Sequence, residues 1–191
     1  MQYSEEFKTP KGFIDVYGHK GSPEFVKIGL GEKQGYFVIP KDSIVQEMHV
    51  KNLVVAKASK FMAKRMVPGV SWGAGIGYLE LGTGVGTGTT QAPQAEASTQ
   101  EALRTSLIRN PISAWTYLDG DGAPTATETN VVQYSTTFTE LEAIGALVEM
   151  GLFGGDATAT AGTGYMFNYK VFAVWNKDDT MQLTIRWEIT Y

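Results

Sequence analysis

The side chains that could carry out chemistry are few and widely separated in this sequence. His19 and His49 are the only histidines, and the chain has no cysteine. Neither histidine belongs to an H-E-x-x-H pair or has a second ligand four residues away, as a helical zinc site requires. No G-x-S-x-G turn presents a serine nucleophile. We therefore expect each histidine to be an ordinary surface or core residue, and we expect no catalytic residue and no metal site.

Paired carboxylates could support acid–base catalysis or bind a cation. The Asp119-Gly120-Asp121-Gly122 segment has part of a calcium-loop pattern, but the third ligand and the closing glutamate of an EF-hand are missing. Asp-Gly is also good turn chemistry. Glu140 and Glu142 stand at an expected helix start and Asp178 and Asp179 in an expected turn, where carboxylates are favoured. These pairs therefore predict turns and caps, not a glycosidase-like site.

A glycine-rich tract has seven glycines between residues 71 and 90. This density suggests a phosphate-binding loop, but a Walker loop ends in Gly-Lys-Ser/Thr, whereas Gly88 is followed by two threonines. No G-x-G-x-x-G opens a helix here either. We interpret residues 82–97 as a Gly/Thr/Ala-rich loop whose small residues let the backbone pass close to a neighbouring surface. Its candidate partner-contact residues are Gly82, Gly84, Gly86 and Gly88, and we expect no cofactor.

These residues belong to a chain of 191 residues, the size of one domain with or without an arm. Apolar residues make up 43% and charged residues 19%, which indicates an ordinary globular protein. The formal net charge of −4 does not favour a basic nucleic-acid-binding surface. No apolar run reaches the roughly 18 residues that suggest a membrane span, and no export signal is recognisable. We expect neither nucleic acid nor membrane as a partner.

The first 50 residues predict an N-terminal β arm or small β layer. Short apolar runs at 13–17, 25–28 and 36–39 alternate with glycines and prolines, which is typical of short strands and turns. So much apolar surface needs another chain or the main domain to cover it. We expect the protein without residues 1–40 to fold but not to assemble. The candidate partner-contact residues in this arm are Phe13, Tyr17, Phe25, Tyr36 and Phe37.

Residues 51–191 predict a second domain in which β-strands are combined with short helices. An apolar stripe at helical spacing predicts a helix over 52–66, capped by Asn52. A capping-box spacing at 98–101 predicts a short helix behind it. The same spacing recurs at 139–142, before an apolar segment that could be a helix or a buried strand.

The clearest strand patterns lie in the last third of the chain. Apolar and polar residues alternate over 131–138 and over 181–191, so the last strand has one apolar face. Residues 165–175 form a continuous apolar run, and the turn chemistry of 176–179 predicts that this run pairs with 181–191 as a hairpin. A further strand is expected at 76–81. The sequence therefore predicts a mainly β fold, an antiparallel β-sandwich with two or three short helices and an N-terminal β arm.

Several short motifs follow one another in a definite order from about residue 50 to the end of the chain. They are Asn52-Leu53-Val54-Val55, Ile76-Gly77-Tyr78-Leu79-Glu80-Leu81-Gly82-Thr83-Gly84, Thr99 to Arg104, Tyr134-Ser-Thr-Thr-Phe138, Glu149-Met150-Gly151-Leu152-Phe153, Gly162-Thr163-Gly164-Tyr165-Met166-Phe167, Lys177 and Leu183-Thr184-Ile185-Arg186-Trp187-Glu188-Ile189. This ordered set resembles a layout common in virion proteins of tailed bacteriophages. Such proteins include capsid decoration (cement) proteins and tail or fibre components, and the resemblance brings no catalytic residues.

The resemblance implies a non-enzymatic structural component of a tailed-phage virion. We expect a decoration protein that binds the major capsid shell, because a small, acidic chain with arms suits symmetric reinforcement of a surface. A tail, collar, fibre or baseplate accessory protein is the first alternative, and a small carbohydrate-binding module or hydrolase is the alternative from a different class. The expected partners are other virion proteins, major capsid or tail proteins, and further copies of this chain in a homo-oligomer such as a trimer.

Overall fold

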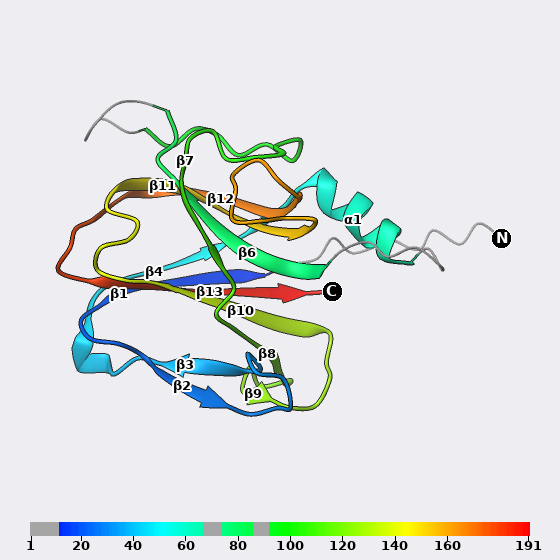
Figure 1. Ribbon diagram of the computed structural model, residues 1–191, viewed down its shortest axis with the longest axis horizontal. Helices are drawn as coiled ribbons and strands as arrows, with labels where there is room; N and C mark the ends of the chain where they lie inside the picture. The colour runs from blue at the N-terminus through cyan, green and yellow to red at the C-terminus, as the bar shows by residue number, and fades with distance from the viewer. Residues whose placement is uncertain (1–11, 67–73, 86–91) are drawn as a thin grey trace.

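Two antiparallel β-sheets face each other in the computed structural model of the protein, with a small hairpin beside them (Figure 1). The structure describes residues 12–66, 74–85 and 92–191. Sheet one contains, in spatial order, β4 (Ile44–Lys51), β1 (Phe13–His19), β13 (Gln182–Thr190), β10 (Val131–Phe138), β8 (Ala114–Leu118) and β9 (Pro124–Thr125). Sheet two contains β5 (Leu53–Val54), β12 (Tyr165–Lys177), β11 (Gly145–Gly155), β6 (Ala74–Gly82) and β7 (Ser106–Pro111). The hairpin pairs β2 (Glu24–Lys27) with β3 (Gly35–Val38).

The main core lies between the two sheets. In β13 the odd-numbered residues from Leu183 to Ile189 are fully buried, whereas Arg186 and Glu188 between them are only partly buried. From sheet two, Leu79 and Leu152 enter the same cluster. Alternation along a strand separates the two faces in this way because successive side chains point to opposite sides of a sheet. The expected mainly β, antiparallel sandwich is therefore confirmed.

The outer side of sheet two is also covered, which explains why nearly all of β11 is buried. A second apolar cluster on that side contains Val55, Leu103, Phe153, Met166 and Tyr169. The helix α1 (Ala56–Met66) packs on β12 there (Figure 1). The described residues contain this one α-helix and one 3-10 helix, η1 (Lys41–Ser43), and no helix among them is long and apolar enough to cross a membrane.

The helix expected over 52–66 begins later than predicted, at Ala56. Residues 53 and 54 instead form β5 and pair with β12, and the Val55 N–H donates to the Phe167 carbonyl oxygen at 3.2 Å. The β-branched residues of this segment suit a sheet edge better than a helix start. Asn52 is therefore not the helix cap, and the Ala56 N–H donates to the Ser98 carbonyl oxygen at 2.7 Å.

The two capping-box segments do not start helices. The short helix expected after 98–101 is wrong, because Ser106–Pro111 forms β7 on the edge of β6. After 139–142, the strand is the correct alternative and becomes β11. The Glu142 carboxylate does accept a hydrogen bond from the Thr139 N–H at 2.8 Å, but it closes a turn. The helix cannot continue because Ala143 and Gly145 have φ values of 55° and 136°.

The expected hairpin of 165–175 with 181–191 is also wrong. Strand β12 pairs with β11 and β5 in sheet two, whereas β13 pairs with β1 and β10 in sheet one. The turn between them, in which the Asp178 carboxylate accepts from the Thr180 N–H at 2.9 Å, carries the chain from one layer to the other. Strands β12 and β13 therefore lie in opposite layers, and each buries an apolar face in the core between the two sheets. A hairpin would place both strands in the same sheet.

The N-terminal segment belongs partly to the sandwich itself. Strand β1 lies between β4 and β13, with Ile14 opposite Trp187 and Val16 opposite Ile185. Ile14 and Val16 are buried in the main core. Only the β2–β3 hairpin forms a separate sheet. The expectation that residues 1–40 can be removed without unfolding is therefore inconsistent with the structure, because their removal takes Ile14 and Val16 out of the main core and separates β4 from β13.

Replacing Trp187 with alanine tests the place of β13 in the core. Trp187 is 0% exposed, and deleting such a side chain costs about 3 to 5 kcal/mol, much of a domain's free energy of unfolding. We expect Trp187→Ala to be insoluble or to unfold at much lower urea concentration than the parent. Leu141→Ala is the control, because Leu141 is 81% exposed and its removal should leave the urea midpoint nearly unchanged. Equal midpoints for the two variants would contradict this core.

Candidate docking surface

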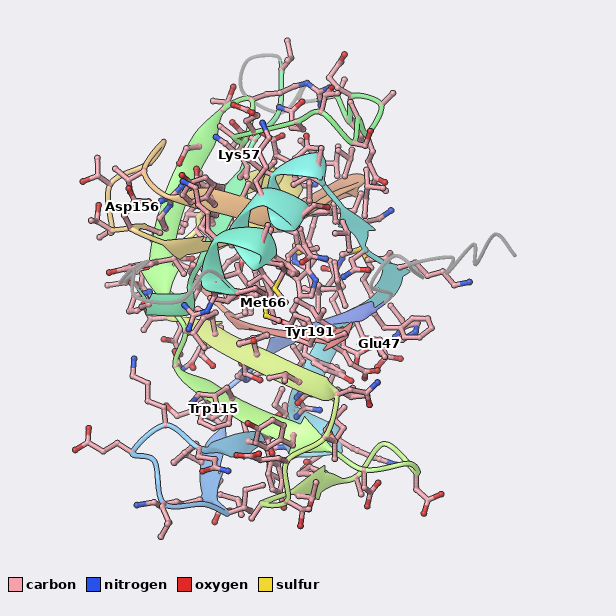
Figure 2. The ribbon with its side chains drawn as sticks, turned by 90° about the vertical axis from the view of Figure 1, so that its right-hand side faces the viewer. Glu47, Lys57, Met66, Trp115, Asp156 and Tyr191 are labelled. Atoms are coloured by element: carbon pink, nitrogen blue, oxygen red, sulfur yellow. The ribbon has the colours of Figure 1, made fainter. Side chains whose placement is uncertain are left out.

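Strand β4 is the outer strand of sheet one, and among the described residues it pairs only with β1. Its side chains are mostly exposed, including Val45, Glu47, His49 and Lys51. Glu47 lies on one flank of the molecule in Figure 2, away from Trp115. An edge strand presents unpaired backbone N–H and C=O groups, so β4 can accept a further strand.

An open pocket of about 730 Å³ lies beside the first half of β4. The Arg186 guanidinium group lies 5.0 Å from the centre of the Tyr17 ring, and its Nη2 donates to the Phe37 carbonyl oxygen at 2.6 Å. Burial raises the pKa of the Tyr17 hydroxyl, which therefore stays neutral at physiological pH. The pocket combines a cation, an aromatic ring and aliphatic side chains, which suits a protein side chain. Its lining residues are Tyr17, Ile39, Lys41, Ile44, Val45, Gln46, Glu47 and Arg186.

The β2–β3 hairpin presents apolar side chains to solvent. Leu30 is 100% exposed and Phe25 is 37% exposed. The Phe25 and Phe37 rings lie 5.6 Å apart and stiffen the hairpin. Its far end is fixed to the sandwich, because the Lys33 carbonyl oxygen accepts from the Trp115 N–H at 2.9 Å. The exposed side chains therefore belong to a hairpin that this hydrogen bond holds against β8.

The structure places all five predicted aromatic contact residues on β1 or the hairpin. Phe13 is exposed at the start of β1 and stacks on His49 with ring centres 5.2 Å apart. Tyr17 lines the pocket, and Phe25 and Phe37 pair across the hairpin. Tyr36 is partly buried opposite Val26. We define the docking surface as β4, the pocket and the β2–β3 hairpin.

The predicted glycine contacts have a different setting. Gly82 and Gly84 are buried, and Gly86 and Gly88 lie outside the described residues. A Cβ atom on Gly82 would lie 2.7 Å from Glu149 Oε1, and the Gly84 N–H donates to that oxygen at 3.2 Å. The absence of a side chain at Gly82 and Gly84 therefore lets the backbone pass close to the buried Glu149 carboxylate of the same chain.

Glu149 is the centre of a polar network that the sequence patterns did not predict. Its Oε1 also accepts from the Thr105 N–H at 2.9 Å, and its Oε2 accepts from the Tyr169 hydroxyl at 2.6 Å. Burial and this carboxylate raise the pKa of Tyr169, whose oxygen accepts in turn from Arg104 at 2.9 Å. The only sequence signal for this network is one carboxylate within an apolar strand.

A second buried pair, Glu80 and Arg109, holds the loop before β12. Arg109 donates to Glu80 and, through Nη1, to the Thr163 carbonyl oxygen at 2.9 Å. Its guanidinium group also lies 3.9 Å from the centre of the Phe153 ring. Both networks satisfy buried charges by tying loops to sheet two, as buried charges require. Neither adjoins the pocket beside β4.

The histidines lie in contrasting surroundings. His19 is buried; its Nδ1 lies 3.0 Å from the Gly21 carbonyl oxygen and its Nε2 2.8 Å from Thr184 Oγ1. A carbonyl oxygen can only accept, so Nδ1 carries the proton and Nε2 accepts from Thr184 in the neutral ring. His49 is exposed and bonds to Asp15. Within the described ranges, no three His, Asp or Glu residues are arranged to hold a metal ion.

Gly84 provides a test of how closely the backbone after β6 approaches β11. Its φ is 64°, and a Cβ atom there would lie 2.5 Å from Val148 Cγ2. We expect Gly84→Ala to lower the free energy of unfolding by about 1 to 3 kcal/mol, because the backbone conformation and the space both disfavour a side chain. Gly77→Ala is the matched control, since a Cβ atom at that residue would have no neighbour within 4 Å. Urea denaturation of both variants measures the difference, and an equal loss would contradict the tight fit at Gly84.

His19 predicts a pH dependence of stability. Burial lowers its pKa, so protonation favours the unfolded chain, in which histidine titrates near its ordinary value of about 6.5. The stability that His19 contributes is therefore present above that value and is lost as the pH falls through the lower, folded-state pKa. Unfolding free energies of the parent and of His19→Gln, measured between about pH 8 and about pH 5, should show a steeper loss in the parent. Parallel curves would contradict the neutral, buried ring.

The comparisons with known proteins add no relative. No family model matches the chain, and no curated protein or solved structure shows significant similarity to it. The docking surface is therefore interpreted from its own geometry.

Proposed function

We propose that the chain is a non-enzymatic structural component of a tailed-phage virion, a decoration protein that binds the major capsid shell through the β2–β3 hairpin of its docking surface. The observation that carries the proposal is the hairpin with exposed Leu30 and Phe25, which is supported on β8 of sheet one. Exposed apolar side chains gathered on one element are typical of protein–protein contact sites. The order of the sequence motifs from about residue 50 onward supplies the virion context.

The way in which the buried charges are used supports a binding role. Glu149 and Glu80 each bond to groups of the same chain that hold loops against sheet two. The pocket beside β4 contains Arg186, Lys41 and Glu47, but neither histidine is among its lining residues. Its cations and aliphatic walls suit an acidic or amphipathic side chain of a partner protein. The role proposed for this surface is to bind a partner protein without catalysing a reaction.

The proposal predicts that the protein is present in purified phage particles and that the hairpin attaches it. We expect the double variant Phe25→Ser/Leu30→Ser to fold but to lose at least about tenfold in copy number per particle, equivalent to about 1.4 kcal/mol of binding free energy. Leu141→Ser is the control, because it removes an equally apolar and exposed side chain outside the docking surface. Copy number is measured by quantitative mass spectrometry of particles assembled with each variant.

The copy number of the parent also separates the candidate locations. Hundreds of copies support a shell protein, whereas six or twelve copies support a tail, collar or baseplate accessory and overturn the decoration role. Absence from particles overturns the virion role itself. Retention of the hairpin variant at the parental level places the attachment site elsewhere on the molecule.

A further inference from the structure

The backbone groups of β4 that face away from β1 can be assigned from one hydrogen bond just beyond the end of the strand. The Asn52 N–H donates to the Gly12 carbonyl oxygen at 3.2 Å, which makes these two residues a hydrogen-bonded pair. Such pairs recur at every second residue of an antiparallel ladder, so Gln46, Met48 and Val50 of β4 bond to β1. The N–H and C=O groups of Glu47, His49 and Lys51 therefore point outward from sheet one.

The free part of this edge is short and has definite ends. The register between β1 and β4 shifts at Gly18/His19, so Val45 is an extra residue at a bulge. At the other end, the chain turns into β5 of sheet two directly after Lys51. Regular outward pairing is therefore possible from Gln46 to Lys51, and no other strand of the described residues occupies it.

The outward residues have a charge order that complements itself. Glu47 is acidic, Lys51 is basic, and His49 lies midway between them. All three side chains are exposed on one face of the strand. In an antiparallel arrangement of two copies of β4, Glu47 of each copy lies opposite Lys51 of the other. A parallel arrangement would place like charges opposite each other, which is unfavourable.

We propose that β4 is the contact between two copies of this chain, joined antiparallel about a two-fold axis at His49. Glu47, His49 and Lys51 then pair with Lys51, His49 and Glu47 of the second copy, and each pair exchanges two backbone hydrogen bonds. The two six-stranded sheets become one continuous sheet. Phe13, which is exposed and stacked on His49, lies next to the axis and contributes apolar contact area.

The self-complementary charge order selects a second copy over an unrelated strand. A C2 contact requires one surface patch to match itself, and a short, centred strand with opposite charges at its ends does so. This inference goes beyond the proposed function, because it is argued from β4 alone and does not require attachment to a particle. Attachment to particles through the hairpin is measured separately, so either idea can fail alone.

Cysteine crosslinking tests the register, and the cysteine-free chain makes the readout unambiguous. At the proposed axis the two copies of residue 49 have Cα atoms about 5.5 Å apart, within the range of a disulfide. Two copies of residue 51 are offset by four residues, about 13 Å, and cannot be bridged. Purified His49→Cys should therefore form a disulfide dimer on mild oxidation, with about tenfold more dimer than Lys51→Cys. A mixture of Glu47→Cys and Lys51→Cys should form the mixed dimer in preference to either self-dimer.

Charge reversal tests the attraction without any crosslink. By sedimentation equilibrium, the parent should have twice its chain mass of 20.8 kDa. Glu47→Lys should shift the population to monomer, and Glu47→Lys/Lys51→Glu should restore the dimer, while circular dichroism confirms that each variant is folded. A parent that is monomeric at every concentration overturns the proposal and means that the bulge and the charges protect this edge. A trimer, or crosslinking of Lys51→Cys as readily as His49→Cys, overturns the two-fold register.

Discussion

The antiparallel pairing of β1 with β13 is the contact on which the rest of the structure depends. It joins residues near the two ends of the chain, with Ile14 opposite Trp187 in the centre of the main core. Because β1 fills this position, β4 becomes the edge strand and the β2–β3 hairpin, which follows β1, stands beside the sandwich. The docking surface is therefore a consequence of how the core is closed.

The molecule divides its polar groups between two tasks. In sheet two, buried charges centred on Glu149 and Glu80 hold long connections in place, where unpaired charges would be costly. In sheet one, Glu47 and Lys51 remain exposed along a strand whose backbone is half unpaired. The exposed side chains of Glu47 and Lys51 lie outside the main core, so their replacement should have little effect on the free energy of unfolding.

The sequence predicts which face of a strand is buried, but it does not predict which strands pair with each other. The alternation of apolar and polar residues in β13 predicts its apolar face directly. Arg186, on the other face, was not predicted to line a pocket, because most arginines on the polar face of a strand simply face water. The Glu142 bond to Thr139 forms as its spacing predicts, yet it closes a turn because the following backbone conformation excludes a helix. Turn chemistry shows that a chain reverses direction, but it does not show whether the chain stays in one sheet. The five candidate aromatic contact residues were chosen for their surplus on a segment rich in turns, and their contact with a partner stays a prediction.

The central position of β13 also sets the order in which the protein can form during synthesis. Its neighbours β1 and β10 are separated by more than a hundred residues of chain and lie on its two sides. Sheet one therefore stays divided until β13 has been synthesised, and β1 and β10 lack this neighbour until then. Contacts so distant in sequence form slowly, and unpaired strands are prone to aggregate in the meantime. We therefore expect a chaperone that shields β1 until β13 has been synthesised to raise the yield of folded protein.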